Sequence, residues 1–156
     1  MLRRTLLQSA IAAPILAACA TNGQLGAADP MAPLPHDTSS YARPDEARVR
    51  HVSLDLTADF DRKAFHGKAT LDIVARADAR EIVLDSKGLI IQRVRAGGRD
   101  TTFTLGDSDP QKGAPLTIQL NGARRIEIEY ESAPNASALQ WLEPAQTASN
   151  KRFLFS

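Results

Sequence analysis

The most constraining feature of this 156-residue chain is an alternation of apolar and polar residues that begins at residue 52. Residues 52–60 carry apolar side chains at every second position, and residues 65–77 repeat the pattern after a short polar turn. Because the side chains of a β-strand point alternately to the two faces of its sheet, each segment is predicted to be a strand with one buried face. Together the two strands are expected to form a long β-hairpin. The buried face of the first strand would carry Val52, Leu54, Leu56, Ala58 and Phe60.

Five further strands are expected in the rest of the chain, with turn residues between them. Gly97-Gly98 predicts a turn, and Asn121-Gly122 is typical of a β-hairpin because both of its residues tolerate positive φ. No helical apolar stripe occurs after the first 18 residues. About seven strands at this spacing predict an all-β fold, either an antiparallel β-sandwich or a saddle-shaped sheet. The five strands are expected at 81–85, 89–95, 102–105, 116–120 and 126–130.

The first 18 residues have the pattern of a lipoprotein signal peptide. Arg3-Arg4 precede an apolar run at 6–18 that is too short to span a bilayer comfortably. The run ends in Ala17-Ala18-Cys19, which resembles a bacterial lipobox, where the cysteine thiol receives a diacylglycerol. We therefore expect lipidation at Cys19, the alternative being a plain signal peptide with a chance cysteine. The paired arginines leave both the general and the twin-arginine export routes open.

Lipidation would tether a folded domain to a membrane on its periplasmic side. Ala20 after the cysteine favours the outer over the inner membrane. Residues 19–47 contain four prolines and no periodic apolar pattern, which predicts an extended tether. The folded domain would then comprise residues 48–156.

Charge and cysteine content exclude two classes of function. Lys and Arg number 19, so removing Arg3 and Arg4 with the signal peptide leaves 17 basic against 18 acidic side chains. A chain this close to neutral, without a cluster of basic residues, lacks the positive charge that nucleic-acid-binding surfaces use. Cys19 is the single cysteine, which excludes both an intramolecular disulfide and a zinc site made of cysteines.

The most specific motif is Ser137-Ala-Leu-Gln-Trp-Leu-Glu-Pro-Ala-Gln-Thr147, which is followed by Phe153-Leu-Phe-Ser156 and holds the only tryptophan. Four shorter pieces precede it in matching order, at 53–60, 67–71, 82–91 and 112–116. Together these segments resemble the N-terminal β domain of the zinc aminopeptidase family, and most closely its leukotriene hydrolase branch. The resemblance covers residues 52–156.

The resemblance implies a scaffold without catalytic residues of its own. Members of the family hold zinc with a His-Glu-x-x-His helix and a downstream Glu. That motif does not occur in this sequence, and His36, His51 and His66 are isolated. We therefore expect no catalytic residue, no metal ligand and no cofactor in this chain, zinc belonging to the full-length family. The chain is expected to be a fragment that ends before the catalytic domain, which would be its partner within one polypeptide.

The residues expected at an interface or in a cavity wall lie in the last two segments. Trp141 is a large apolar anchor whose indole N–H needs a partner. In the family this region lies near the catalytic domain, so the resemblance implies that these residues contact it or help to wall the substrate cavity. The alternative function is a stand-alone lipid-anchored β-sandwich that binds a peptide or protein at an exposed sheet edge. The interface candidates are Gln140, Trp141, Leu142, Phe153 and Phe155.

Overall fold

The computed structural model describes residues 29–35 and 37–156, and the predicted signal peptide and Cys19 lie outside them. Over the described residues it contains ten strands, one 3-10 helix and no α-helix. No helix of this part is long and apolar enough to cross a membrane. The elements are β1 (Ala47–Asp59), β2 (Ala64–Ala75), β3 (Glu81–Ser86), β4 (Leu89–Ala96), β5 (Arg99–Asp100), β6 (Phe103–Leu105), β7 (Ala114–Gln119), β8 (Arg125–Ser132), β9 (Gln140–Leu142), η1 (Pro144–Gln146) and β10 (Phe153–Phe155).

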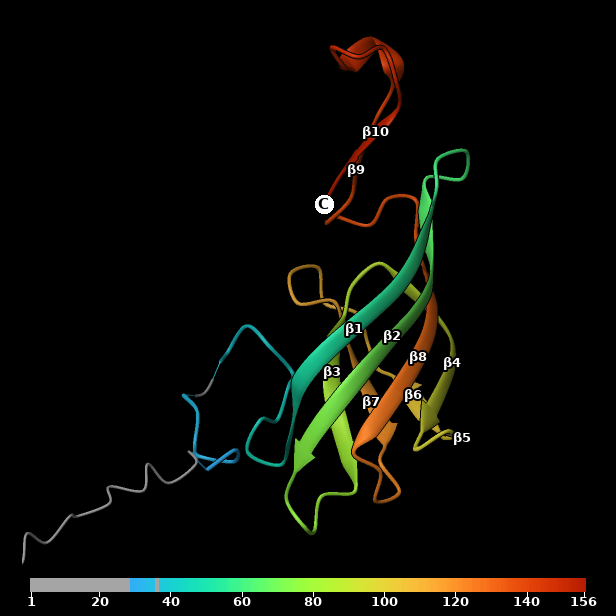
Figure 1. Cartoon of the computed structure of the whole chain (residues 1–156). Helices are drawn as coiled ribbons and strands as arrows, with labels where there is room; N and C mark the ends of the chain where they lie inside the picture. Colours follow the sequence, from blue (N-terminus) through green and yellow to red (C-terminus); the bar gives the residue numbers. More distant parts are fainter. Residues whose placement is uncertain (1–28, 36) are drawn as a thin grey trace, which may run out of the picture.

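The strands form three sheets in which all pairings are antiparallel. A five-stranded sheet has the order β1-β2-β8-β4-β5, and a three-stranded sheet has the order β3-β7-β6. The two sheets share one apolar core, and β9 and β10 form a separate hairpin that projects beyond them (Figure 1). The expected all-β class is confirmed. The core side chains are Ala47, Ala69, Leu71, Ile73, Ile82, Val94, Leu116, Ile118, Leu120, Ile126 and Ile128.

Each of the seven expected strands is present, with boundaries shifted by a few residues. The predicted number was nevertheless wrong, because β5, β9 and β10 are additional. These three strands contain only two or three residues each. Segments this short hardly display a period of two, and β6, which is as short, was predicted from the turn and loop on either side of it.

The Asn121-Gly122 turn joins two sheets and does not close a hairpin, which corrects the prediction. Both residues have positive φ, 48° and 79°, and the Ala123 N–H donates to the carbonyl of Leu120 across 2.8 Å. The flanking strands nevertheless find different partners, since β7 pairs with β3 and β6 while β8 pairs with β2 and β4. Local turn chemistry therefore set the conformation of the turn, whereas the pairing depended on which apolar faces meet in the core.

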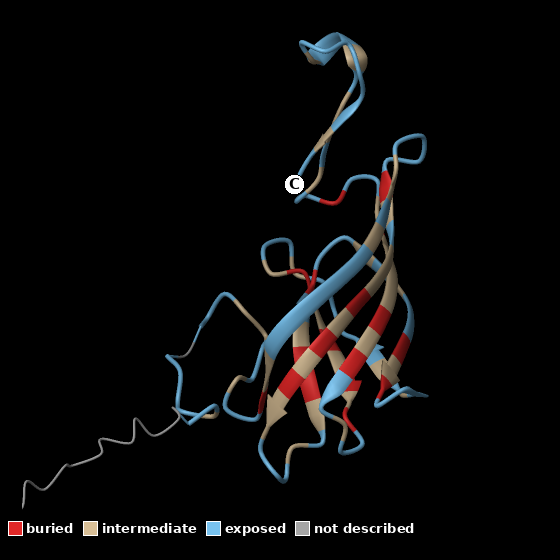
Figure 2. Cartoon of the chain, viewed as in Figure 1, coloured by how far each residue is buried: buried red, intermediate tan, exposed pale blue. Residues whose placement is uncertain are grey.

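The expected burial of one face of β1 is also wrong in its middle part. Val52 lies opposite Leu71 and Leu54 lies opposite Ala69, so all four side chains occupy the same face of the sheet. Leu71 and Ala69 are buried, but Val52 and Leu54 are 50% and 58% exposed. Exposed residues run along most of β1, beside the alternating burial of β2 and β8 (Figure 2). The reason is geometric: β1 is an end strand, and only its first residues, among them Ala47 and Val49, pack on the core that the two sheets share.

Candidate interface at the C-terminal hairpin

The five candidate residues lie in the projecting hairpin of β9 and β10. Its register places Trp141 opposite Leu154. Since partners across an antiparallel pair share a face, these two side chains occupy one face of the hairpin. The other four candidates occupy the opposite face. They are Gln140, Leu142, Phe153 and Phe155.

Trp141 attaches the hairpin to the tip of the β1–β2 hairpin. Its ring meets Phe60 edge-on, with centroids 5.4 Å apart at 87°, and packs on Phe65 with centroids 5.9 Å apart at 50°. Offset and edge-to-face aromatic pairs of this kind add about 0.5–1.5 kcal/mol beyond the area they bury. The indole N–H is shielded from solvent, yet within the described residues it has no hydrogen-bond acceptor. This group would gain an acceptor if a further chain packed here.

Two ion pairs join the same elements at the surface. Lys63 Nζ lies 2.8 Å from Glu143 Oε1, and the Arg152 guanidinium donates to the carboxylate of Asp61. The hydrogen bond from Lys63 lowers the pKa of Glu143, and the bond to Asp61 raises the pKa of Arg152. All four side chains are largely exposed, so the pairs orient the hairpin more than they stabilise it.

The far face of the hairpin is apolar and open to solvent. Phe153 and Phe155 are 53% and 64% exposed, and Leu142 beside them is half-buried. Gln140 is exposed at the edge of the same face. Two exposed phenylalanines on a three-residue strand supply the kind of contact area that aromatic anchors provide at protein interfaces. The arrangement is suited to binding, and it contains no group that could act as a nucleophile.

A cavity of about 240 Å³ lies where the hairpin meets the five-stranded sheet. Its wall is mostly apolar and includes Leu56, Leu89 and Leu139, together with the chain's last residue, Ser156. Tyr130 also lines it, and burial raises the pKa of its phenol. The sequence analysis did not assign these residues to a site. Only the tertiary structure brings them together, because they come from β1, β4, β8, the loop before β9 and the residue after β10.

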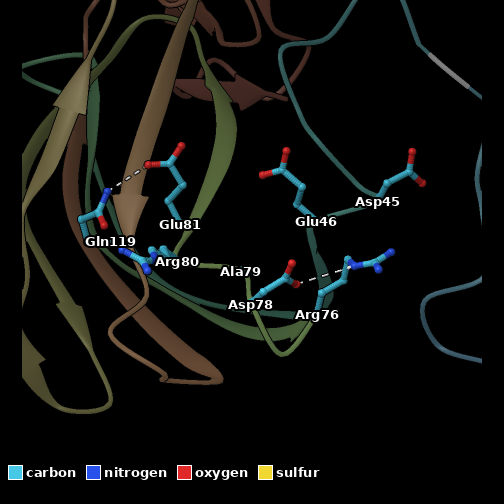
Figure 3. Close-up of a pocket in the computed structure, with 8 residues that line it drawn as sticks. All are labelled: Asp45, Glu46, Arg76, Asp78, Ala79, Arg80, Glu81 and Gln119. Atoms are coloured by element: carbon cyan, nitrogen blue, oxygen red, sulfur yellow. Dashed lines mark hydrogen bonds and ion pairs between the residues drawn. The ribbon is translucent and has the colours of Figure 1, made fainter.

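A second, charged cavity of about 590 Å³ lies at the opposite end of the sheets and is lined by Glu46, Glu81 and Gln119, among others (Figure 3). Two of the carboxylates that line it are paired with an arginine beside it. Arg43 pairs with Glu46 and Glu81, and the Gln119 amide donates to Glu81 across 2.9 Å. The hydrogen bond from Arg43 is the main cause of the lowered pKa of Glu81. None of the predicted site residues lies in this cavity.

Part of the segment predicted to be a tether contacts the three-stranded sheet. The Ser40 hydroxyl and the Tyr41 N–H both donate to the carboxylate of Asp85 in β3, across 2.6 and 2.8 Å. Lys112 places its ammonium 5.3 Å from the centre of the Tyr41 ring. The residues just before β1 thus contact the three-stranded sheet. The assignment of residues 19–47 to a tether stays a prediction.

Within residues 29–35 and 37–156 no group of three or more His, Cys, Asp or Glu side chains could hold a metal ion. His51 lies on β1 opposite Asp72, and His66 lies on β2 opposite Thr57. His36 and Cys19 lie outside the described residues.

Comparison with known proteins assigns the described domain to one region of larger enzymes. No family model matches the chain. It is 36% identical over 128 residues to leukotriene A-4 hydrolase of Xenopus laevis, covering 77% of this chain and 21% of the relative. It is 34% identical over 130 residues to leucine aminopeptidase 2 of Phaeosphaeria nodorum, covering 78% of this chain and 21% of that protein.

Solved structures agree with the sequence comparison. Native yeast LTA4 hydrolase superimposes with a TM-score of 0.72 at 26% identity, over 78% of this chain and 20% of that one. The same enzyme in complex with bestatin gives a TM-score of 0.72 at 25% identity. The chain thus spans about a fifth of the length of the relatives it matches. It is homologous to the N-terminal region of the leukotriene A-4 hydrolases and leucine aminopeptidases 2.

Proposed function

We propose that this domain is the non-catalytic N-terminal scaffold of a zinc-dependent aminopeptidase related to leukotriene hydrolase. In such a protein a catalytic domain would hydrolyse the N-terminal peptide bond of short peptides, with zinc activating a water molecule. The domain described here would pack against that catalytic domain and help to wall its substrate cavity. By itself it would be inactive.

One observation carries this proposal. In a chain that matches its relatives over about a fifth of their length, three of the predicted contact residues form an apolar face at one end of the domain. Phe153, Phe155 and Leu142 on that face are joined to the sheets through Trp141. A binding surface without nearby catalytic groups fits a scaffold better than an enzyme.

The test has two parts. The 156-residue chain, supplied with zinc, should show no hydrolysis of leucine anilides and no stoichiometric zinc binding. A chimaera should retain hydrolysis when residues 48–156 replace the matching segment in leucine aminopeptidase 2 of Phaeosphaeria nodorum. The same enzyme with the segment deleted is the control and should be inactive. Turnover by the chain alone, or an inactive chimaera beside an active parent, would contradict the proposal.

The membrane anchor belongs to the same proposal and rests on the sequence. Cys19 would carry the lipid, and the tether of residues 19–47 would link it to the domain on the periplasmic side, with the outer membrane favoured over the inner. Two acyl chains give a stable anchor where a single chain is marginal. In a bacterial host, Cys19→Ser should abolish labelling by radioactive fatty acid and move the protein from the membrane to the soluble fraction. Unchanged membrane partitioning of the variant would refute lipidation.

A further inference from the structure

The inner face of β1 carries an apolar strip that the rest of the described chain does not cover. Val52 and Leu54 lie on the face that is buried on the neighbouring strand β2, yet each exposes half or more of its surface. Leu56 continues the strip and lines the cavity of about 240 Å³ beside the C-terminal hairpin. The strip therefore runs from the middle of β1 to the cavity where Ser156 lies.

The backbone of the same strand is also open. β1 ends the order β1-β2-β8-β4-β5 and pairs only with β2 among the described strands. It contains 13 residues, long for a strand with one free edge. A free edge offers a row of N–H and C=O groups to another strand, and native proteins usually cover or shorten such edges. Here an open edge and an uncovered apolar face coincide on one strand.

Three features indicate what covers them. The relatives are about five times as long as the matched segment, so most of each relative's chain lies outside it. Ser156 lies at the cavity that ends the strip, between the projecting hairpin and the sheets (Figure 1). The shielded Trp141 N–H, which has no acceptor in the described residues, lies in this hairpin.

We propose that the strip of Val52, Leu54 and Leu56, with the free edge of β1, binds an extended strand from the part of an aminopeptidase-type protein that lies outside this domain. The strand would add to β1 by backbone hydrogen bonds, and its alternate apolar side chains would cover Leu54 and Val52. This inference rests on the proposed function, because that function supplies the partner.

The experiment compares two exposed residues in two contexts. Leu54 on the inner face is 58% exposed, and Ile90 on the outer face of the same sheet is 54% exposed, so Ile90→Asp is a matched control for Leu54→Asp. In the 156-residue chain both variants should leave the urea midpoint nearly unchanged. In the chimaera described above, Leu54→Asp should shorten the half-life of activity at raised temperature roughly tenfold, because a carboxylate would be buried there. Ile90→Asp should leave that half-life unchanged.

Hydrogen exchange tests the strand edge directly. Amides of β1 should exchange faster in the 156-residue chain than in the chimaera, whereas those of the central strand β8 should be equally protected in both. Equal exchange of β1 in the two contexts would overturn the added strand.

The remaining outcomes separate the two proposals. An active chimaera in which Leu54→Asp behaves like Ile90→Asp overturns this inference and leaves the scaffold function standing. An inactive, unsubstituted chimaera overturns the scaffold function itself. Sedimentation of the 156-residue chain tests whether a second copy of this chain occupies the strip. A dimer that Leu54→Asp converts to a monomer would show that it does. That result would also overturn the inference.

Discussion

At the scale of single residues, Trp141 has the clearest structural role. It is the only tryptophan, and it connects the projecting hairpin to two phenylalanines of the β1–β2 tip. The sequence predicted a large apolar anchor in this position, and its contacts with Phe60 and Phe65 agree with that role. The sequence could not identify the residues that contact Trp141. Phe60 and Phe65 lie about 80 residues away, and nothing in their alternation with polar residues distinguishes them from other strand residues.

Removal of this anchor should loosen the hairpin. Trp141→Ala is expected to lower the free energy of unfolding by about 2 kcal/mol, less than the about 3–5 kcal/mol typical of a fully buried tryptophan, because this ring is half-buried. Phe153→Ala on the exposed face should change it by less than about 0.5 kcal/mol. Urea denaturation followed by circular dichroism measures both. Equal losses for the two variants would show that Trp141 is no anchor.

Glu81 should make stability depend on pH. Its folded-state pKa is lowered, chiefly by the hydrogen bond from Arg43, so the carboxylate stabilises the fold above the unfolded-state pKa. That contribution disappears as pH falls through the lowered folded-state pKa. Glu81→Gln should therefore cost about 0.5–1 kcal/mol at neutral pH, and the difference from the natural chain should close below about pH 4.

Arg43→Gln supplies the matched partner for a double-mutant cycle. The coupling energy between Arg43 and Glu81 should be measurable in urea at pH 7 and vanish near pH 3. A coupling of equal size at both pH values would mean that the charge of Glu81 is not its source.

At the scale of elements, alternation and turn signals located seven of the ten described strands, while neighbouring strands decided burial and pairing. The first long hairpin was predicted correctly, because β1 and β2 are adjacent in sequence and their turn is short. The Asn121-Gly122 hairpin was predicted wrongly, because the strands on either side belong to different sheets. Burial could not be predicted from the pattern either, as Val52 and Leu54 show. The alternation indicates which face of a strand is apolar but not which element covers that face.

The pairing of β1 with β2 depends on a glycine that the alternation treated as an ordinary small residue. Gly67 has a φ of 152°, and a Cβ there would lie 2.1 Å from the carbonyl oxygen of Asp55. Gly67→Ala should therefore destabilise the domain by about 3 kcal/mol or more. Gly122→Ala should cost about 1 kcal/mol, because its φ is 79° but no atom lies within 4 Å of the added methyl. Thermal denaturation of the two variants would test the ranking, and the reverse order would contradict it.

At the scale of the whole molecule, strands distant in sequence form the central contacts. β2 pairs with β8 through residues 66–72 and 125–131, and β3 pairs with β7 across the second sheet. Loops must close before such pairings stabilise the chain, so the topology favours slow folding.

Refolding should accordingly take on the order of milliseconds to seconds. Stopped-flow dilution from urea, followed by Trp141 fluorescence and by far-ultraviolet circular dichroism, measures the rate at the hairpin and in the sheets. Coincident single phases would indicate that the hairpin docks with the sheets as one unit. A dominant microsecond phase in both signals would contradict the dependence on long-range pairing.

The sequence alone determined the all-β class, seven of the strands, the turns and the segment around Trp141 that relates the chain to larger enzymes. These features depend on side-chain period, turn chemistry and short motifs, which act over a few residues. The tertiary structure alone decided which strands share a sheet, how the two larger sheets meet, and that Val52 and Leu54 on β1 are left uncovered. Those outcomes depend on contacts between residues far apart in the chain. Several apolar faces could pack against one another, and no local pattern specifies which of them do.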